Sequence, residues 1–313
     1  MYVNRLRFFI VTFVALLPCL PAAAYDRLVV FGDSLSDVGN TYALSGGTNP
    51  PAPPYFPGRT SNGPVWVEYL APRLGVPAPS ASRLGGSDAT NYAYHGASVV
   101  GGTSVPSIQE QVTTYLASNT PDPDDLFVYW GGTNDFLAGQ LNATVPATAA
   151  ASQITSLANA GAKNILVLNL PPLGETPAVR NDPFRRAVAN SLATTFNQTL
   201  ATQLATARTT LPSDVAITEF DVHGLFGQMF ANPASFGLTN VRDAALTFTP
   251  LPTIVPNPDQ YLFWDTGHPT TVAHSILAAA IPEPGGFAIL VIPVAAGFMR
   301  RRPRRVTLSC CPS

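Results

Sequence analysis

The body of this chain, residues 25 to 281, contains no cysteine. The three cysteines of the sequence lie near its two ends, at positions 19, 310 and 311. This distribution excludes a disulfide framework and a thiolate metal site in the body. Histidine is scarce too, with four in 313 residues, and these form no ligand-spaced cluster. Because the sequence also lacks a Walker-type loop and a Rossmann fingerprint, we expect neither a metal nor an organic cofactor.

Positive charge is also scarce in the body. Seven of the 17 basic residues are arginines at the two ends of the chain, which leaves ten between residues 25 and 281. The same stretch holds 18 of the 19 acidic residues, so its formal net charge is −8. An acidic body without a basic stripe argues against nucleic acid as a partner.

No hydrophobic run in the sequence is long enough to cross a bilayer comfortably. The first, residues 8–20, follows Arg5 and Arg7 and precedes the small residues 22–24. This order is typical of a secretory signal, so we expect residues 1–24 to be a signal peptide removed before Tyr25. A retained membrane anchor and a lipoprotein box around Cys19 are the alternatives, but about 20 apolar residues are needed for a span.

The last part of the chain, residues 282–313, forms a separate segment. Prolines at 282 and 284 flank Glu283 and end any preceding helix, because proline lacks the amide donor that a helix interior needs. The uncharged stretch 285–299 follows, and then five arginines, which the positive-inside rule keeps on the cytoplasmic side. This order resembles the PEP-CTERM sorting signal. The resemblance implies transient membrane contact, processing by an exosortase-type protease, and a location at the cell surface or outside the cell. A plain C-terminal anchor is the alternative.

Between these ends, strand-like and helix-like segments alternate, which predicts a parallel sheet covered by helices. The predicted strands are nearly continuous apolar runs, typical of a sheet buried on both faces. They are Leu28–Phe31, Thr90–Ala93, Leu126–Trp130, Ile165–Leu170 and Val215–Phe220. The predicted helices are Val65–Leu74, Ile108–Ala117, Ala147–Ala160, Pro183–Thr206 and Thr271–Ala280. Residues 42–60 and 230–258 are expected to be loops, and the second could cover a substrate cleft.

Two short segments place reactive side chains at the edges of these elements. Ser34 follows the first predicted strand, and ligands bind at this carboxyl edge in open parallel sheets. Asp265 lies three residues before His268, so one local turn can hold both. Such a serine, histidine and aspartate supply the nucleophile, base and orienting acid of a serine hydrolase. A lone serine at this place would more often be a helix cap.

Four short blocks, in order along the chain, extend this pattern. They read GDSL at 32–35, NYAYHGA at 91–97, GTND at 132–135 and DTGH at 265–268. They resemble the blocks of the GDSL/SGNH hydrolase superfamily, and residues 59–68 and 169–174 resemble its bacterial lecithinase/haemolysin-like branch. Together the resemblance covers nearly all of residues 25–281.

The resemblance implies a three-layer α/β/α sandwich, flavodoxin-like, around a mostly parallel five-stranded sheet. It also assigns roles in acyl transfer. Ser34 would attack the ester carbonyl, His268 would take and return the proton, and Asp265 would orient the imidazole. The oxyanion would be held by the Ser34 and Gly96 amides and by the Asn134 side chain.

We therefore expect an exported serine ester hydrolase acting on lipid or short-chain acyl esters. A polysaccharide O-acetyl esterase, an acyltransferase, and a matrix protein without catalysis on the same scaffold are the alternatives. His95 stands where many relatives have a second glycine, so it could line the pocket or crowd the oxyanion loop. We expect Asp33 and Asp135 to shape their loops, His223 to be structural, and His274 to pack in the last helix or face solvent.

Overall fold

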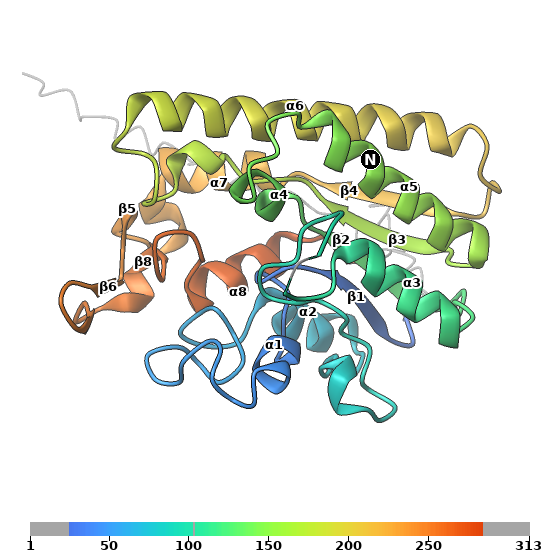
Figure 1. The fold of residues 1–313 in the computed structure, drawn as a ribbon, viewed down its shortest axis with the longest axis horizontal. Helices are drawn as coiled ribbons and strands as arrows, with labels where there is room; N and C mark the ends of the chain where they lie inside the picture. Colours follow the sequence, from blue (N-terminus) through green and yellow to red (C-terminus); the bar gives the residue numbers. More distant parts are fainter. Residues whose placement is uncertain (1–24, 103, 284–313) are drawn as a thin grey trace, which may run out of the picture.

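Four parallel strands form the central sheet of the computed structural model, which describes residues 25–102 and 104–283 (Figure 1). The predicted signal peptide and nearly all of the predicted sorting segment lie outside these residues. The strands run in the order β1, β2, β3, β4. Every residue of β1 and β2 is buried, as their apolar runs predict. The bounds are Leu28–Gly32 for β1, Leu126–Trp130 for β2, Asn164–Leu168 for β3 and Ala216–Phe220 for β4.

The fifth strand, predicted at Thr90–Ala93, is not a regular strand. Its backbone follows the free edge of β1 in parallel, since Val30 exchanges hydrogen bonds with Thr90 and Tyr92 at 2.9 and 2.7 Å. The Gly32 amide, which would continue the ladder to the Tyr92 carbonyl, donates instead to Gln111 Oε1 at 2.9 Å, so the ladder stays short. The segment still lies at the position that completes a flavodoxin-like order around β1.

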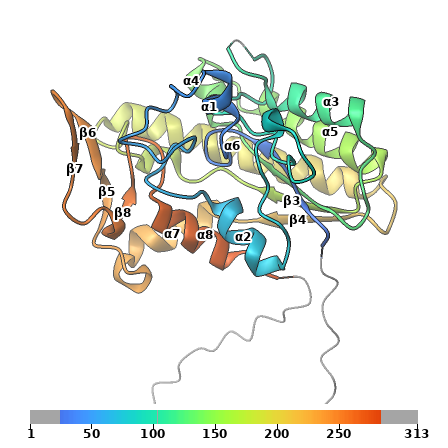
Figure 2. The ribbon, with the colours of Figure 1, turned by 90° about the horizontal axis from the view of Figure 1, so that it is seen from below.

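Alternate residues of the strands face two separate cores, so the sheet lies between two helical layers (Figure 2). Leu28 and Val30 face α2, α7 and α8 on one side, and Val29 and Phe31 face α3, α5 and α6 on the other. This is the expected three-layer α/β/α sandwich. The first layer comprises α2 (Trp66–Leu74), α7 (Val222–Ala231) and α8 (Thr271–Ala280). The second comprises α3 (Ile108–Ser118), α5 (Thr144–Ala160) and α6 (Pro183–Arg208).

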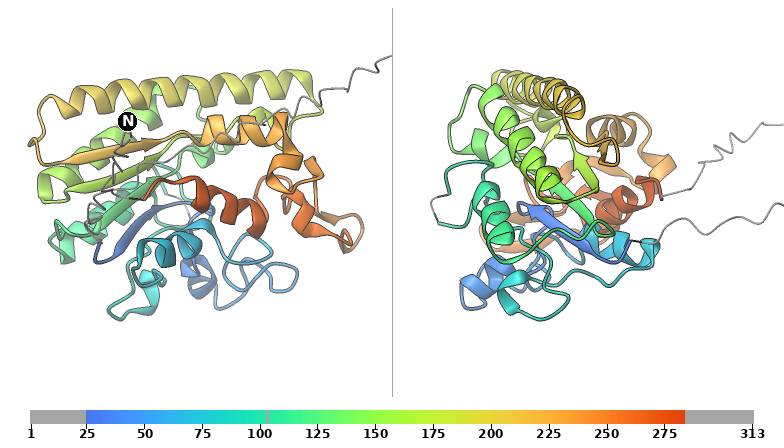
Figure 3. Two further views of the ribbon diagram at one scale, coloured as in Figure 1. Left: turned by 180° about the vertical axis from the view of Figure 1, so that it is seen from behind. Right: turned by 90° about the vertical axis from the view of Figure 1, so that its right-hand side faces the viewer.

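The long helix α6 begins where its cap predicts. The Asp182 side chain accepts hydrogen bonds from the amides of Phe184 and Arg185, and Pro183 occupies the first helical position. In the rear view of Figure 3, α6 runs along one edge of the molecule, above the sheet. The start of this helix lies at the same end as the carboxyl ends of the strands, where it borders the site described below.

The region from residue 230 to 258, predicted as a loop, contains short strands. β5 pairs in parallel with β8, and β6 pairs with β7 in an antiparallel hairpin that projects from the body (Figure 3). These strands are β5 (Asn240–Ala244), β6 (Leu246–Phe248), β7 (Pro252–Ile254) and β8 (Tyr261–Phe263). Short helices complete the fold: α1 (Asn40–Leu44), η1 (Ser82–Leu84), α4 (Thr133–Leu137), η2 (Leu173–Glu175), η3 (Pro233–Phe236) and η4 (Pro258–Gln260). Across the described residues, no helix combines the length and the apolar character that a membrane span requires.

Candidate active site

Ser34, Asp265 and His268 come together at the carboxyl edge of the sheet. Ser34 lies in the tight turn after β1, where the Asp33 carbonyl accepts the amides of Ser36 and Asp37. Asp265 and His268 lie in the loop between β8 and α8. That loop is closed at its base by a hydrogen bond of 2.7 Å from the Trp264 amide to the His268 carbonyl. Two chain segments more than 200 residues apart therefore meet at one point.

The three side chains form a continuous hydrogen-bonded chain. The Nε2 atom of His268 lies 3.0 Å from the Ser34 Oγ atom, and its Nδ1 atom lies 2.8 Å from Asp265 Oδ2. The other carboxylate oxygen of Asp265 accepts the amides of Gly267 and His268, each at 2.8 Å. Because the carboxylate is fixed by its own loop, the imidazole has its Nε2 aimed at the serine. This geometry lets the histidine remove the hydroxyl proton.

The charges of the site favour a basic histidine. Burial lowers the pKa of His268, but the charge and hydrogen bond of Asp265 and the charge of Asp33 outweigh burial, so the pKa is raised above 6.5. Burial likewise opposes ionisation of Asp265, yet His268 and the two amide donors hold the pKa of this carboxyl well below its usual 3.8. The pair therefore favours a charged imidazolium beside a carboxylate, the state that forms after proton removal.

The predicted oxyanion donors come from the turn after β1, the loop that holds Gly96, and the first turn of α4. Within residues 25–102 and 104–283, the amides of Ser34 and Gly96 donate to no protein acceptor, which leaves them free for a ligand. Gly96 has a φ of +85°, a conformation that favours glycine, while a Cβ there would meet no neighbour. The left-handed backbone conformation therefore favours glycine at position 96, whereas a lack of space for a side chain does not. One Asn134 amide hydrogen donates to the Ala97 carbonyl at 3.0 Å, which ties this side chain to the Gly96 loop.

Tyr55 is a site residue that the sequence analysis missed. Its hydroxyl donates to Asp265 Oδ2 at 2.7 Å, the same oxygen that binds the imidazole. Its ring packs edge-on against Trp264, the residue before Asp265. Tyr55 lies in the proline-rich loop 42–60, 210 residues from Asp265, and no motif connects the two. Only the folded chain brings them together.

The remaining polar residues near the site stabilise the local backbone, with one exception. Asp33 accepts the Leu35 amide, and burial raises the pKa of Asp33 to about 6. Asp135 accepts the Val99 amide. Both carboxylates therefore shape their loops, as expected from the sequence. His95 is the exception, because its ring lies 5.6 Å from that of His268, and burial together with that neighbour lowers the pKa of His95 to about 4.

The other two histidines make no hydrogen bond to the three residues of the candidate site among the described residues. His274 is buried in α8 and packs in the core, one of the two positions expected for it, and burial lowers its pKa to about 3. His223 donates its backbone amide to the Asn169 side chain at the start of α7. Among the described residues, no group of three or more acidic, histidine or cysteine side chains is arranged to hold a metal ion.

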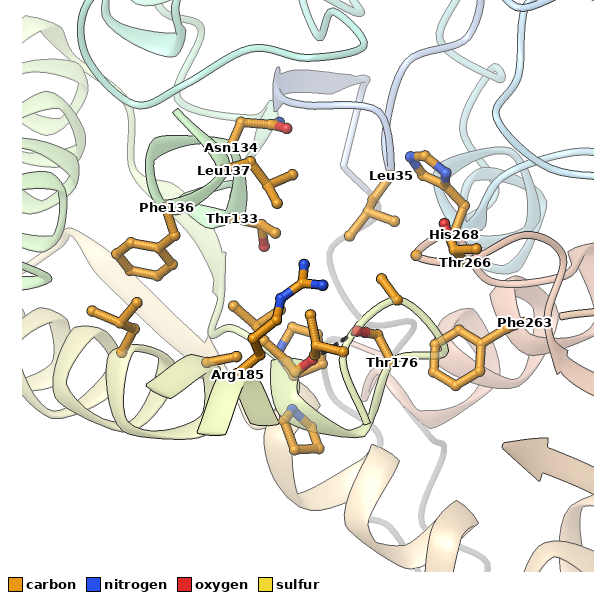
Figure 4. Close-up of a pocket in the computed structure, with 18 of the residues that line it drawn as sticks. Leu35, Thr133, Asn134, Phe136, Leu137, Thr176, Arg185, Phe263, Thr266 and His268 are labelled. Carbon is orange, nitrogen blue, oxygen red and sulfur yellow. Dashed lines mark hydrogen bonds between the residues drawn. The ribbon is translucent and has the colours of Figure 1, made fainter. Parts of the chain in front are cut away.

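A cavity of about 460 Å³ opens beside Ser34 (Figure 4). Ser34, Asn134, Asp265 and His268 line one part of it, and the rest is lined mainly by apolar side chains. The predicted cover at 230–258 contributes none of the lining residues. The apolar walls come chiefly from α4, η2, the start of α6, α7 and the end of β8: Leu35, Phe136, Leu137, Leu141, Leu173, Val179, Phe184, Val188, Leu192, Phe226 and Phe263.

One basic side chain, Arg185, reaches into this cavity from the first turn of α6 (Figure 4). The neighbouring cations are neutralised, since Arg186 pairs with Glu175 and Arg180 with Asp243. Within the part of the chain that the structure describes, Arg185 has no carboxylate within salt-bridge distance. The site thus combines a nucleophile, an apolar cleft and a cation.

A parallel α/β sandwich with a serine, a histidine and an aspartate at its carboxyl edge has the arrangement of an acyl-transfer enzyme. A family model described as GDSL-like Lipase/Acylhydrolase matches residues 28–281. The chain belongs to this family, whose members are esterases, lipases and acyltransferases.

Among its relatives, a phosphatidylcholine-sterol acyltransferase of Aeromonas hydrophila is 32% identical, over 83% of this chain and 89% of that protein. A thermolabile hemolysin of Vibrio parahaemolyticus is 28% identical, over 82% of this chain but 63% of its own length. A solved structure of a lipolytic G-D-S-L protein from Veillonella parvula covers 81% of this chain and 93% of its own, with a TM-score of 0.45 and 16% identity.

Proposed function

We propose that this protein is an exported ester hydrolase whose nucleophile is Ser34 and whose preferred substrates are esters of apolar acyl chains. The observation that carries the proposal is the hydrogen-bonded chain from Ser34 through His268 to Asp265, placed at one end of an apolar cavity. The charges of Asp265 and Asp33 and the hydrogen bond to Asp265 stabilise the imidazolium form of His268 and outweigh the opposing effect of burial.

Catalysis on this geometry proceeds in two acyl transfers. The Ser34 oxygen attacks the ester carbonyl carbon while His268 Nε2 takes the hydroxyl proton, and the same proton then passes to the leaving alcohol as the ester bond breaks. Water next attacks the acyl-enzyme and gives one proton to His268. As the bond between the acyl carbon and Ser34 Oγ breaks, His268 returns this proton to Oγ, which releases the carboxylic acid and regenerates the Ser34 hydroxyl. Asp265 stays ionised throughout and holds the imidazole in the required tautomer.

The negative oxygen of each tetrahedral intermediate would accept hydrogen bonds from the Ser34 amide, the Gly96 amide and the Asn134 side chain. The free amides and the second Asn134 hydrogen support this assignment. Loss of one such donor in other acyl-transfer enzymes costs about 10²–10³ in kcat.

The substrate class follows from the cavity. Its walls are leucine, valine, phenylalanine and alanine, which favour a fatty acyl chain over the acetyl group of a polysaccharide. Arg185 adds a cation to the same cavity, and it favours a substrate with an anionic group such as a phosphodiester. The acyltransferase relative supports a second candidate, transfer of the acyl group to an alcohol in place of water.

We also propose export and processing of the ends of the chain. The expected signal at residues 1–24 and the PEP-CTERM-like segment 282–313 support a mature protein outside the cytoplasm, anchored to the membrane until an exosortase-type protease acts. Mass spectrometry of protein recovered from the cell exterior should show a chain that lacks the five terminal arginines. Intact arginines at 300–305 would contradict processing.

Hydrolysis of p-nitrophenyl esters of graded chain length tests the activity. The wild type should hydrolyse them with a preference for medium or long chains, while Ser34→Ala should be inactive on all of them. A preference limited to acetyl esters would favour the polysaccharide esterase, and an added alcohol that diverts the acyl group from water would favour the acyltransferase.

A further inference from the structure

The β6–β7 hairpin presents three exposed apolar side chains, Phe248 and Leu251 at its turn and Ile254 nearer its base. The exposed fractions of Phe248, Leu251 and Ile254 are 53%, 71% and 46%. The whole stretch from residue 244 to residue 258 is uncharged, between Asp243 and Asp259, in a body with a net charge of −8. Contiguous exposed apolar side chains without charge mark an interaction surface.

The hairpin is rooted on the loop that holds the candidate base. The Leu246 amide donates to the Trp264 carbonyl at 2.6 Å, and the Ala245 amide donates to the Phe263 carbonyl at 3.0 Å. Ala245 and Leu246 share a small core with Trp264, the neighbour of Asp265. The apolar tip therefore has a fixed position relative to the reacting groups.

A second group of exposed apolar side chains lines the cavity. Leu137, Leu141 and Phe184 line the opening, with exposed fractions of 79%, 72% and 77%. Phe184 is at the start of α6, and Figures 1 and 2 place this start and the hairpin at the same end of the molecule. The two exposed apolar groups therefore lie at the same end of the molecule.

We propose that this end of the molecule docks on a zwitterionic lipid surface, with the hairpin tip inserted among the lipid chains. The proposal rests on the proposed activity toward esters of apolar acyl chains, because such a substrate would pass from the lipid past Leu137, Leu141 and Phe184 into the cavity. A net charge of −8 on the body disfavours anionic lipids. Prolines at 250, 252 and 256 remove backbone donors, so addition of a protein strand to the hairpin is disfavoured.

A tryptophan reporter tests the docking locally, whatever the ends of the chain do at a membrane. The native tryptophans 66, 130 and 264 are buried and give a constant background. In the full chain carrying Ser34→Ala, Leu251→Trp should shift its fluorescence to shorter wavelength with phosphatidylcholine vesicles, and brominated phosphatidylcholine should quench it. The matched control is Leu84→Trp, at an exposed leucine in η1 outside both apolar groups, and it should show neither effect.

Adding Phe248→Ser and Ile254→Ser to the Leu251→Trp reporter should raise the lipid concentration for half-maximal shift about tenfold. With Ser34 intact, the same two substitutions should leave hydrolysis of soluble p-nitrophenyl butyrate unchanged.

The absence of a lipid-dependent fluorescence shift in the Leu251→Trp reporter, or an equal shift in the Leu84→Trp control, would overturn docking. A shift that instead follows protein concentration without lipid would assign the surface to a second copy of the chain. The reporter does not measure catalysis. A wild type that does not hydrolyse p-nitrophenyl butyrate would therefore refute the proposed activity separately from docking.

Discussion

The chemical role of each residue in the candidate site depends on the side chains that it contacts. His268 lies between Ser34 Oγ and Asp265 Oδ2, and Asp265 in turn accepts a hydrogen bond from Tyr55. The carboxylate is thus shared between an imidazole and a phenol. Burial, the Asp265 charge and this hydrogen bond raise the pKa of the Tyr55 hydroxyl above its usual 10, so it remains a donor at neutral pH.

The acid limb of the activity profile should lie above pH 6.5. His268 acts as a base only when neutral, and its pKa is raised above 6.5. Activity therefore falls as pH falls through that raised value, and it is fully present above it. A pH series of kcat/KM on a soluble p-nitrophenyl ester measures this limb. A limb well below pH 6.5 would show that Asp265 does not stabilise the imidazolium.

Tyr55→Phe should lower kcat/KM about tenfold, because it removes one hydrogen bond to a charged group that orients the imidazole. Without this donor the Asp265 carboxylate is more basic and attracts the imidazolium more strongly, so the acid limb should move to higher pH. The matched control is Tyr42→Phe, a tyrosine in the neighbouring α1. A uniform loss of activity with an unmoved limb would indicate a merely structural role for Tyr55.

At the scale of elements, the chemistry is assembled from the carboxyl ends of β1 and β2 and from the loop between β8 and α8. The apolar part of the cavity is formed chiefly by η2 and the first turns of α6, while α4 contributes both Asn134 and the apolar Phe136 and Leu137. Acyl specificity can therefore vary without disturbing the triad. This separation is consistent with a family that includes both hydrolases and acyltransferases.

Val188→Trp should shorten the preferred acyl chain. Val188 lies on the cavity face of α6, and a tryptophan there fills space that a long chain would occupy. Hydrolysis of long p-nitrophenyl esters should fall at least about tenfold more than that of the butyrate, the scale of losing two buried methylene contacts. Ala187→Trp is the control, because Ala187 is exposed and does not line the cavity. Equal losses of activity for all acyl chain lengths would show that this cavity does not determine acyl specificity.

At the scale of the whole molecule, buried neutral histidine limits stability in acid. Burial lowers the pKa of His274 to about 3, whereas an unfolded histidine titrates near 6.5. Between these values the unfolded chain binds a proton that the folded chain does not, so stability falls as pH falls. His274→Leu should remove a slope of about 1.4 kcal/mol per pH unit over this range. Urea unfolding at several pH values measures it, and parallel curves for wild type and variant would contradict the prediction.

Much of the fold could be predicted because its determinants are local. The apolar run of β2 and the helix α8 have the predicted bounds, and the Asp182 cap marks the start of α6. The irregular segment at 90–93 could not be predicted, because the Gln111 side chain that takes the Gly32 amide from its ladder comes from far along the chain.

The site follows the same division between local and long-range determinants. Four short motifs supplied its expected members, which the structure brings to one edge of the sheet. Tyr55 carries no motif, and the hairpin at 246–254 has too few residues and too many prolines to be identified as strands. Both depend on contacts with Trp264 that exist only in the folded chain.

Acylation of Ser34 most directly tests whether this residue is the nucleophile. A p-nitrophenyl ester of a medium-length acid, mixed with the full chain and trapped by rapid acid quench, should add one acyl group to the peptide that contains Ser34. Mass spectrometry locates the group, and Ser34→Ala should show neither the acyl group nor turnover. Turnover retained by Ser34→Ala, or an acyl group on another residue, would contradict the account.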